Sequence, residues 1–153
     1  NAFFGYFYLP DSLVTYALGS CIGICLYDPG LGIGALGHIM LPSCPEGCQD
    51  GNPFKYADTC VPIMLREMLK LGCQKARITA RIAGGARMFQ ISGDNAFGAI
   101  GERNTAAVKA ALAKSAIRLL AEDTGENYGR TVYLHTETGR VEVRSHNKPT
   151  KHL

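Results

Sequence analysis

Residues 15–42, with the sequence TYALGSCIGICLYDPGLGIGALGHIMLP, decide how this chain folds. Two short runs rich in branched and aromatic residues, 22–27 and 33–37, lie on either side of Asp28, Pro29 and Gly30. Apolar runs that flank an Asp-Pro-Gly break are typical of a β-hairpin. We therefore expect two antiparallel strands joined by a tight turn.

The expected hairpin brings a cysteine, Cys21, and a histidine, His38, towards each other. Directly opposed residues share one face of a sheet. Pairing of Tyr27 with Gly32 would place Cys21 opposite His38, and a register two residues away would leave them as diagonal neighbours on one face. A shift by one residue would put them on opposite faces. The sequence leaves the register open, but a thiol and an imidazole on one face are the minimal parts of a Cys–His nucleophile.

The surroundings of Cys21 favour a catalytic thiol. The residue follows Gly19 and Ser20, a step that can set the thiol at a turn with backbone N–H groups facing outward. Thr15 lies one strand upstream, where its hydroxyl can orient the imidazole of His38. A histidine also raises the thiolate fraction of its partner, and the thiolate is the attacking form. The alternative is that the cysteine packs as a small hydrophobic residue.

The composition excludes several classes of protein. The chain is 46% hydrophobic and 19% charged, with a net charge of +3 and no clustered run of Lys and Arg. Nucleic acid is therefore not an expected partner. No apolar run reaches the about 18 residues of a transmembrane helix, so we expect a protein that is not membrane-embedded. A length of 153 residues predicts one domain over residues 1–153.

The cysteines favour a cytoplasmic, reduced protein. They are Cys21, Cys25, Cys44, Cys48, Cys60 and Cys73. Cys44, Cys48 and Cys60 invite a zinc interpretation, but their spacing differs from the usual Cys-x-x-Cys pairs and no fourth ligand is evident. We therefore expect ordinary free thiols, no metal and no cofactor, and we keep a zinc-dependent hydrolase as an alternative.

The rest of the chain predicts an α+β fold, sandwich-like, with a central, mostly antiparallel sheet system and two main helices packed outside it. Besides the hairpin, strands are expected at residues 2–9, 12–18, 74–83, 116–121, 131–135 and 139–144. Helical spacing predicts a helix over 58–71 that starts late or bends at Pro62 and ends at Gly72. A second helix is expected from a cap at Asn104 or Thr105 to Lys114, after a loop at 98–103. Residues 145–153 are expected to be a frayed tail.

Two adjacent glycines, Gly84 and Gly85, follow the strand expected at 74–83. A phosphate-binding loop is not indicated, because neither GxGxxG nor GxxxxGK[ST] is present. The pair more simply permits close approach of another backbone or unusual backbone angles.

Six segments extend the pattern along the chain: LGSC at 18–21, HIMLP at 38–42, KYAD at 55–58, IAGGA at 82–86, IGERN at 100–104 and AEDTG at 121–125. In this order and spacing they resemble the CheD family of bacterial chemoreceptor glutamine deamidases. The chain departs from the family pattern at Glu126, at Pro62 and in the cysteine-rich loop at 45–51. None of these departures falls on the catalytic positions.

The resemblance implies three catalytic residues: Cys21 as the nucleophile, His38 as general base and acid, and Thr15 as the residue that orients His38. The oxyanion and substrate loop is expected at Gly19, Ser20, Gly84 and Gly85. The implied activity is hydrolysis of glutamine side chains of methyl-accepting chemotaxis receptors to glutamate, through a thioester and without a cofactor. The phosphatase CheC is an implied binding partner. The alternative from another class is a non-catalytic module that binds CheC or a receptor.

Overall fold

The computed structural model describes residues 3–7, 12–46, 51–88 and 99–153, and for 3–7 only the backbone is considered. The strands are β1 (Phe3–Phe7), β2 (Ser12–Leu18), β3 (Ile22–Asp28), β4 (Ile33–Ile39), β5 (Thr79–Gly84), β6 (Arg118–Thr124), β7 (Arg130–His135), β8 (Arg140–Arg144) and β9 (Lys151–His152). The helices are α1 (Ala57–Lys70) and α2 (Ile100–Lys114), with 3-10 turns η1 (Pro53–Lys55) and η2 (Lys75–Arg77).

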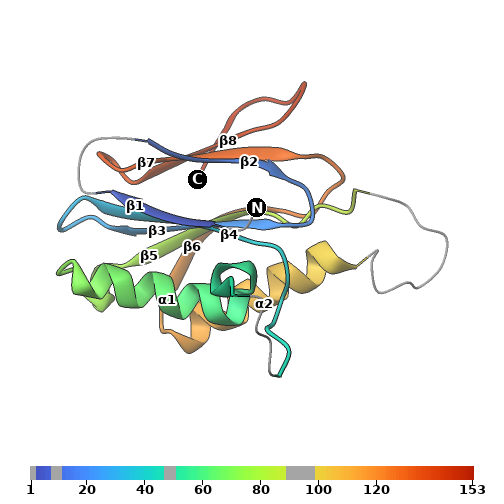
Figure 1. The fold of residues 1–153 in the computed structure, drawn as a ribbon. Coiled ribbons are helices and arrows are strands. Elements are labelled where there is room, and N and C mark those ends of the chain that lie inside the picture. Colours follow the sequence, from blue (N-terminus) through green and yellow to red (C-terminus); the bar gives the residue numbers. More distant parts are fainter. Residues whose placement is uncertain (1–2, 8–11, 47–50, 89–98) are drawn as a thin grey trace.

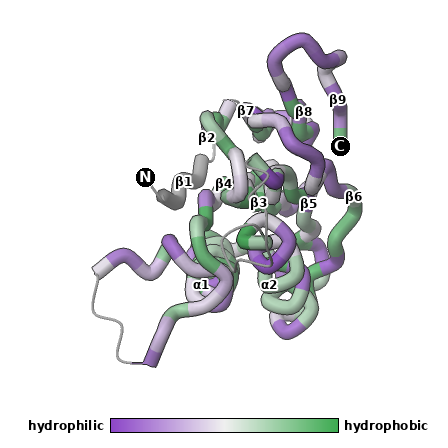
Figure 2. The backbone as a smooth tube through the Cα atoms, turned by 90° about the vertical axis from the view of Figure 1, so that its right-hand side faces the viewer, coloured by the Kyte–Doolittle hydropathy of each residue, from purple (hydrophilic) through white to green (hydrophobic). Residues whose placement is uncertain are grey.

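These elements form three layers (Figure 1). The first sheet, in the order β1-β4-β3-β5-β6, is covered on one face by α1 and α2 and on the other face by the second sheet, in the order β2-β7-β8-β9. Figure 2 shows the same layers from the side. The predicted α+β fold is confirmed, and the pairing is antiparallel except between β5 and β6, which α2 connects as a parallel crossover.

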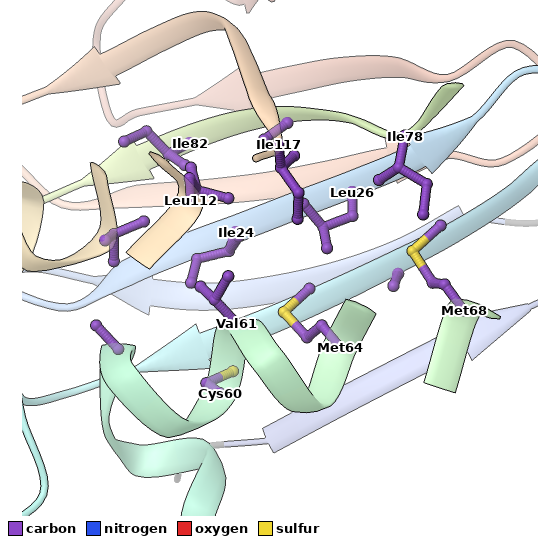
Figure 3. Close-up of a cluster of buried hydrophobic side chains, with 14 of the residues drawn as sticks. Ile24, Leu26, Cys60, Val61, Met64, Met68, Ile78, Ile82, Leu112 and Ile117 are labelled. Carbon is purple, nitrogen blue, oxygen red and sulfur yellow. The ribbon is translucent and has the colours of Figure 1, made fainter. Parts of the chain in front are cut away.

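The β3–β4 hairpin is the centre of the molecule and is buried along its whole length. One face packs on the helices, where Ile24 and Leu26 meet Val61 and Met64 of α1 (Figure 3). The other face packs on the second sheet, where Leu36 belongs to a cluster shared with β2, β7 and β8. Burial on both faces explains why these strands read as nearly continuous apolar runs instead of alternating ones.

A bulge in β2 determines which of its side chains point towards the hairpin. Thr15 pairs with Val132 and Leu18 with Arg130, so one extra residue lies between the two pairs. Ala17 has a φ of 57° in this bulge. As a result Thr15 and Leu18 are both buried although they are three positions apart, whereas the intervening Tyr16 is 64% exposed.

The helix boundaries differ from those expected. Helix α1 begins at Ala57 and carries Pro62 on its exposed face, so the expected late start is wrong. Its end is as predicted, because Gly72 has a φ of 93° and the N–H of Cys73 donates to the carbonyl of Met68. Helix α2 begins at Ile100, not at residue 104.

Three strand predictions also need correction. The strand expected from residue 74 begins at Thr79, because residues 75–77 form the turn η2. The strand expected at 116–121 runs from Arg118 to Thr124. The end of the chain is not frayed: β9 pairs with β8, and the N–H of Leu153 donates to the carbonyl of Val141. No helix among the described residues is long and apolar enough to cross a membrane.

Candidate active site

Three elements bring the predicted catalytic residues to one place in the fold. Thr15 lies on β2, Cys21 in the bend between β2 and β3, and His38 on β4. The β3–β4 register pairs Gly23 with His38 and Tyr27 with Gly34. Direct opposition of the cysteine and the histidine is therefore wrong. The register two residues away holds, and Cys21, one residue before the first residue of β3, packs against the cluster on the face that meets the second sheet, the face on which His38 contacts Thr15.

Thr15 reaches across from the second sheet to His38. Its Oγ1 lies 2.8 Å from the Nδ1 atom of His38. The threonine is 1% exposed and the histidine 6% exposed. A buried hydrogen bond of this length holds the ring in one orientation and leaves Nε2 as the nitrogen on the other side of the ring.

Gly23 makes room for this contact. It lies directly opposite His38, and a Cβ atom at this position would be 3.4 Å from the Cγ2 of Thr15 and 3.0 Å from the Cδ1 of Leu18. The side chains of β2 thus fill the space above the glycine. The missing side chain lets the threonine approach the imidazole.

Burial keeps the cysteine and the histidine neutral. It lowers the pKa of His38 to about 4, so that the imidazole is uncharged at neutral pH. Burial likewise raises the pKa of the half-buried Cys21 thiol above its ordinary value. The resting pair is therefore a thiol and a neutral imidazole, not a thiolate–imidazolium ion pair. An uncharged imidazole is the form that accepts a proton.

The two adjacent glycines support the Cys21 bend from behind. The N–H of Gly85 donates to the carbonyl of Cys21 at 2.9 Å, and the N–H of Ala86 donates to the carbonyl of Gly19 at 2.8 Å. Gly84 has a φ of 123°, and a Cβ atom there would collide with the carbonyl oxygen of Cys21. The N–H of Gly85 is thus engaged with the bend.

Two backbone donors remain at the bend. The N–H of Gly19 donates to the carbonyl of Ala17. Among the described residues, the backbone N–H groups of Ser20 and Cys21 donate to no other backbone carbonyl. Paired N–H groups next to a nucleophile can bind a developing oxyanion.

Asn104 is a site residue that sequence reasoning missed. Its Nδ2 donates to the carbonyl oxygens of Ser20 and Met40, each at 2.9 Å. We expected Asn104 as a helix cap, but it lies inside α2 and is fully buried. Its place in the IGERN segment was the only sequence signal.

The remaining cysteines are in different states. Cys25, Cys60 and Cys73 are free and buried, and burial raises the pKa of Cys25 and Cys60 to about 12. Cys44 is disulfide-bonded, so the expectation of a free thiol is wrong there, and Cys48 lies outside the described residues. Within the described ranges no three His, Cys, Asp or Glu side chains gather to hold a metal.

A cysteine and a buried histidine on one face of a buried hairpin, with a threonine of the facing sheet bonded to the histidine, are the parts that a cysteine-nucleophile hydrolase requires. Residues 40–145 match the CheD family, described as CheD chemotactic sensory transduction. The chain is 51% identical over 136 residues to a probable chemoreceptor glutamine deamidase CheD from Syntrophomonas wolfei, covering 89% of this chain and 84% of that protein. It is 47% identical to a probable chemoreceptor glutamine deamidase CheD 2 from Geobacter metallireducens, covering 94% and 90%. The chain belongs to the CheD family.

Proposed function

We propose that this protein is a chemoreceptor glutamine deamidase that acts in chemotaxis, with Cys21 as its nucleophile. The observation that carries the proposal is the buried hydrogen bond of 2.8 Å between Thr15 and His38, on the face that Cys21 shares. The names of the relatives from Syntrophomonas wolfei and Geobacter metallireducens support the substrate, a glutamine side chain of a chemoreceptor.

The first half of the reaction forms a thioester. As the sulfur of Cys21 bonds to the amide carbon of the glutamine, its proton passes to Nε2 of His38 and the carbonyl electron pair moves onto oxygen. The backbone N–H groups of Ser20 and Cys21 stabilise that oxyanion. The carbonyl then re-forms, the C–N bond breaks, and His38 returns the proton to the leaving nitrogen, which departs as ammonia.

The second half releases glutamate. His38 takes a proton from water while the water oxygen bonds to the thioester carbon. The C–S bond breaks, and the proton returns to the sulfur of Cys21. Thr15 holds Nδ1 throughout, so that Nε2 stays directed at the reacting atoms. Each turnover replaces a neutral receptor amide by a carboxylate.

The lowered pKa of His38 and the raised pKa of Cys21 support a concerted first step. Because burial keeps His38 neutral and holds Cys21 as a thiol, the proton transfers as the S–C bond forms. The imidazole is in its basic form at every pH above about 4. The acid limb of activity therefore lies well below neutral pH.

The proposal also covers the domain organisation, the compartment and a binding partner. We take residues 1–153 as one deamidase domain that works in the cytoplasm. The free thiols Cys21, Cys25, Cys60 and Cys73 support a reducing compartment, whereas the disulfide at Cys44 does not. The family resemblance supports the phosphatase CheC as a further binding partner.

The test compares two cysteines of the same hairpin. A purified chemoreceptor cytoplasmic fragment is incubated with wild-type protein, Cys21→Ala or Cys25→Ala, and glutamine-to-glutamate conversion is followed by mass spectrometry. We expect Cys21→Ala to abolish conversion. Cys25 faces the same sheet but is fully buried in the core, so Cys25→Ala should retain conversion. Wild-type conversion by Cys21→Ala would reject Cys21 as the nucleophile, whereas the absence of conversion by the wild-type protein would favour a binding module.

A further inference from the structure

We propose that Asn104 is a positioning residue that fixes the Cys21 bend relative to the His38 strand by bonding both ends of the hairpin at once. The inference rests on the proposed function, since it concerns the geometry between the thiol and the imidazole. It adds a residue from α2, an element that carries none of the three expected catalytic residues.

Strand pairing alone does not fix that geometry, because it ends before Cys21. The last β3–β4 pair is Ile22 with Ile39. Beyond it the arms bond to different segments. The carbonyl of Cys21 accepts from Gly85, whereas the N–H of Met40 donates to the carbonyl of Lys55 in η1. At the open end of the hairpin, the arm that contains Cys21 is thus bonded to Gly85 and the arm that contains Met40 is bonded to η1, so no strand pairing joins the two arms there.

The amide of Asn104 closes this open end. An amide nitrogen carries two hydrogens, and here each has its own carbonyl oxygen, that of Ser20 and that of Met40. Ser20 immediately precedes Cys21, and Met40 is two residues after His38. One side-chain atom therefore bonds to the main chain beside each proposed catalytic residue.

Packing alone does not explain an asparagine at this place. The other buried residues of α2 are Gly101, Val108 and Leu112, which are all apolar. The Oδ1 of Asn104 is buried and has no hydrogen-bond partner among the described residues. An unpartnered acceptor destabilises the folded state. The two carbonyl contacts account for a polar residue that the core would not otherwise favour.

Close backbone packing fixes the position of the first turns of helix α2 relative to the Cys21 bend. Gly101 lies against the backbone of Gly85, so closely that a Cβ atom at Gly101 would collide with the Gly85 carbonyl. Gly85 in turn donates to the carbonyl of Cys21. The first turns of α2 thus support the bend both through Gly85 and through Asn104. Loss of the amide would let the bend shift relative to β4, and small displacements of reacting groups lower rates steeply.

The test separates lost contacts from lost stability. Asn104→Leu keeps the branched shape and the number of side-chain heavy atoms and removes both donors together with the unpartnered acceptor, and Asn104→Ala removes the side chain beyond Cβ. Val108→Ala, one turn further along the same buried face, removes core packing but no hydrogen bond, because a valine side chain makes none. Each variant is assayed for kcat and KM on a chemoreceptor cytoplasmic fragment, for thermal unfolding, and for the pH dependence of Cys21 alkylation by iodoacetamide.

We expect both Asn104 variants to lower kcat about 10- to 100-fold while KM changes little. Their pH profiles of Cys21 alkylation should match that of His38→Ala, because the imidazole is no longer placed to accept the proton of the thiol. Val108→Ala should unfold at a lower temperature yet keep kcat and the wild-type alkylation profile. A folded Asn104→Leu or Asn104→Ala with wild-type kcat would overturn the inference, as would an equal loss of kcat in Val108→Ala. Normal deamidation by Cys21→Ala would reject Cys21 as the nucleophile, independently of the results with the Asn104 variants.

Discussion

Thr15 and His38 meet because two local irregularities coincide. The bulge at Ala17 lets both Thr15 and Leu18 point inward, and the glycine opposite His38 leaves room for the threonine methyl group. Neither feature is catalytic. Together they place a hydroxyl 2.8 Å from a buried imidazole nitrogen.

The hydroxyl and the methyl group of Thr15 can be tested separately. Thr15→Val keeps the shape but leaves Nδ1 of His38 without this partner, whereas Thr15→Ser keeps the hydroxyl and loses the methyl group. We expect Thr15→Val to lower kcat about 10- to 100-fold, in the range for a displaced catalytic group. Thr15→Ser should stay close to wild type in kcat and lose about 1 kcal/mol of stability through the lost methyl group.

Both variants are compared by deamidation kinetics and by chemical denaturation. Wild-type kcat in Thr15→Val would show that the hydroxyl does not orient the imidazole. A loss of kcat in Thr15→Ser as large as that in Thr15→Val would assign the effect to packing on Gly23.

At this scale, the sequence predicted the residues better than their geometry. Cys21, His38 and Thr15 were identifiable from the hairpin pattern and from the family resemblance. The register was not, because consecutive glycine-rich and apolar positions fit several pairings. Asn104 looked like a cap, since asparagine favours helix starts, and only the tertiary structure shows its side chain between two carbonyls.

Among the elements, the turn between β3 and β4 is held by the segment that leads into β5. The buried carboxylate of Asp28 accepts from the Nε of Arg77 at 2.8 Å and from the Nη2 at 3.0 Å. It also accepts from the backbone N–H groups of Gly30 and Gln74. Hydrogen bonding to Arg77 lowers the pKa of Asp28 to about 2, even though burial opposes the shift.

This carboxylate predicts a pH-dependent stability. Because the pKa of Asp28 is depressed in the folded state, its contribution is present above the ordinary carboxyl pKa of about 4 and is lost as the pH falls towards about 2. We expect Asp28→Asn to lower the free energy of unfolding by about 2 kcal/mol at pH 7, as for hydrogen bonds to a charged group. The difference between wild type and variant should shrink below pH 4.

Denaturant titrations at several pH values measure this difference. Glu67→Gln is the control, because Glu67 contacts Arg66 and Lys70 on the surface of α1, where ion pairs contribute little. A difference for Asp28→Asn that stays constant between pH 7 and pH 3 would contradict the assignment.

Element types were more predictable than element ends. Strand β2 and the end of α1 at Gly72 follow from local patterns. The start of α2 did not, because Gly101 suggested a loop where the structure uses the glycine to bring the helix against Gly85. The bulge at Ala17 was equally hidden, since its positive φ is imposed by the pairing of β2 with β7.

In the whole molecule, the hairpin separates two cores. Helices α1 and α2 pack on one face of it, and the sheet of β2, β7, β8 and β9 packs on the other (Figure 1). The strands and helices expected along the chain predicted an α+β domain with helices outside the sheets. It did not predict that both helices lie on the same face, or that β9 returns to pair with β8, because such contacts join segments that are far apart in the sequence.

This arrangement leaves one end of the central hairpin as the meeting point of β2, the Gly84–Gly85 segment and α2. The hydrogen bonds described for the Cys21 bend come from these segments and from the adjacent Ala86. The proposed reaction depends on one step, the formation of a covalent bond between the thiol of Cys21 and the substrate.

The direct measurement is peptide mapping by mass spectrometry after a chemoreceptor fragment and the enzyme are mixed and quenched with acid. We predict an adduct on the peptide that contains Cys21, with the mass of enzyme and substrate peptides less one molecule of ammonia. Hydroxylamine should release the adduct as a substrate hydroxamate, and Cys21→Ala should form none. An adduct on any other residue, or deamidation at the wild-type rate by Cys21→Ala, would contradict the account.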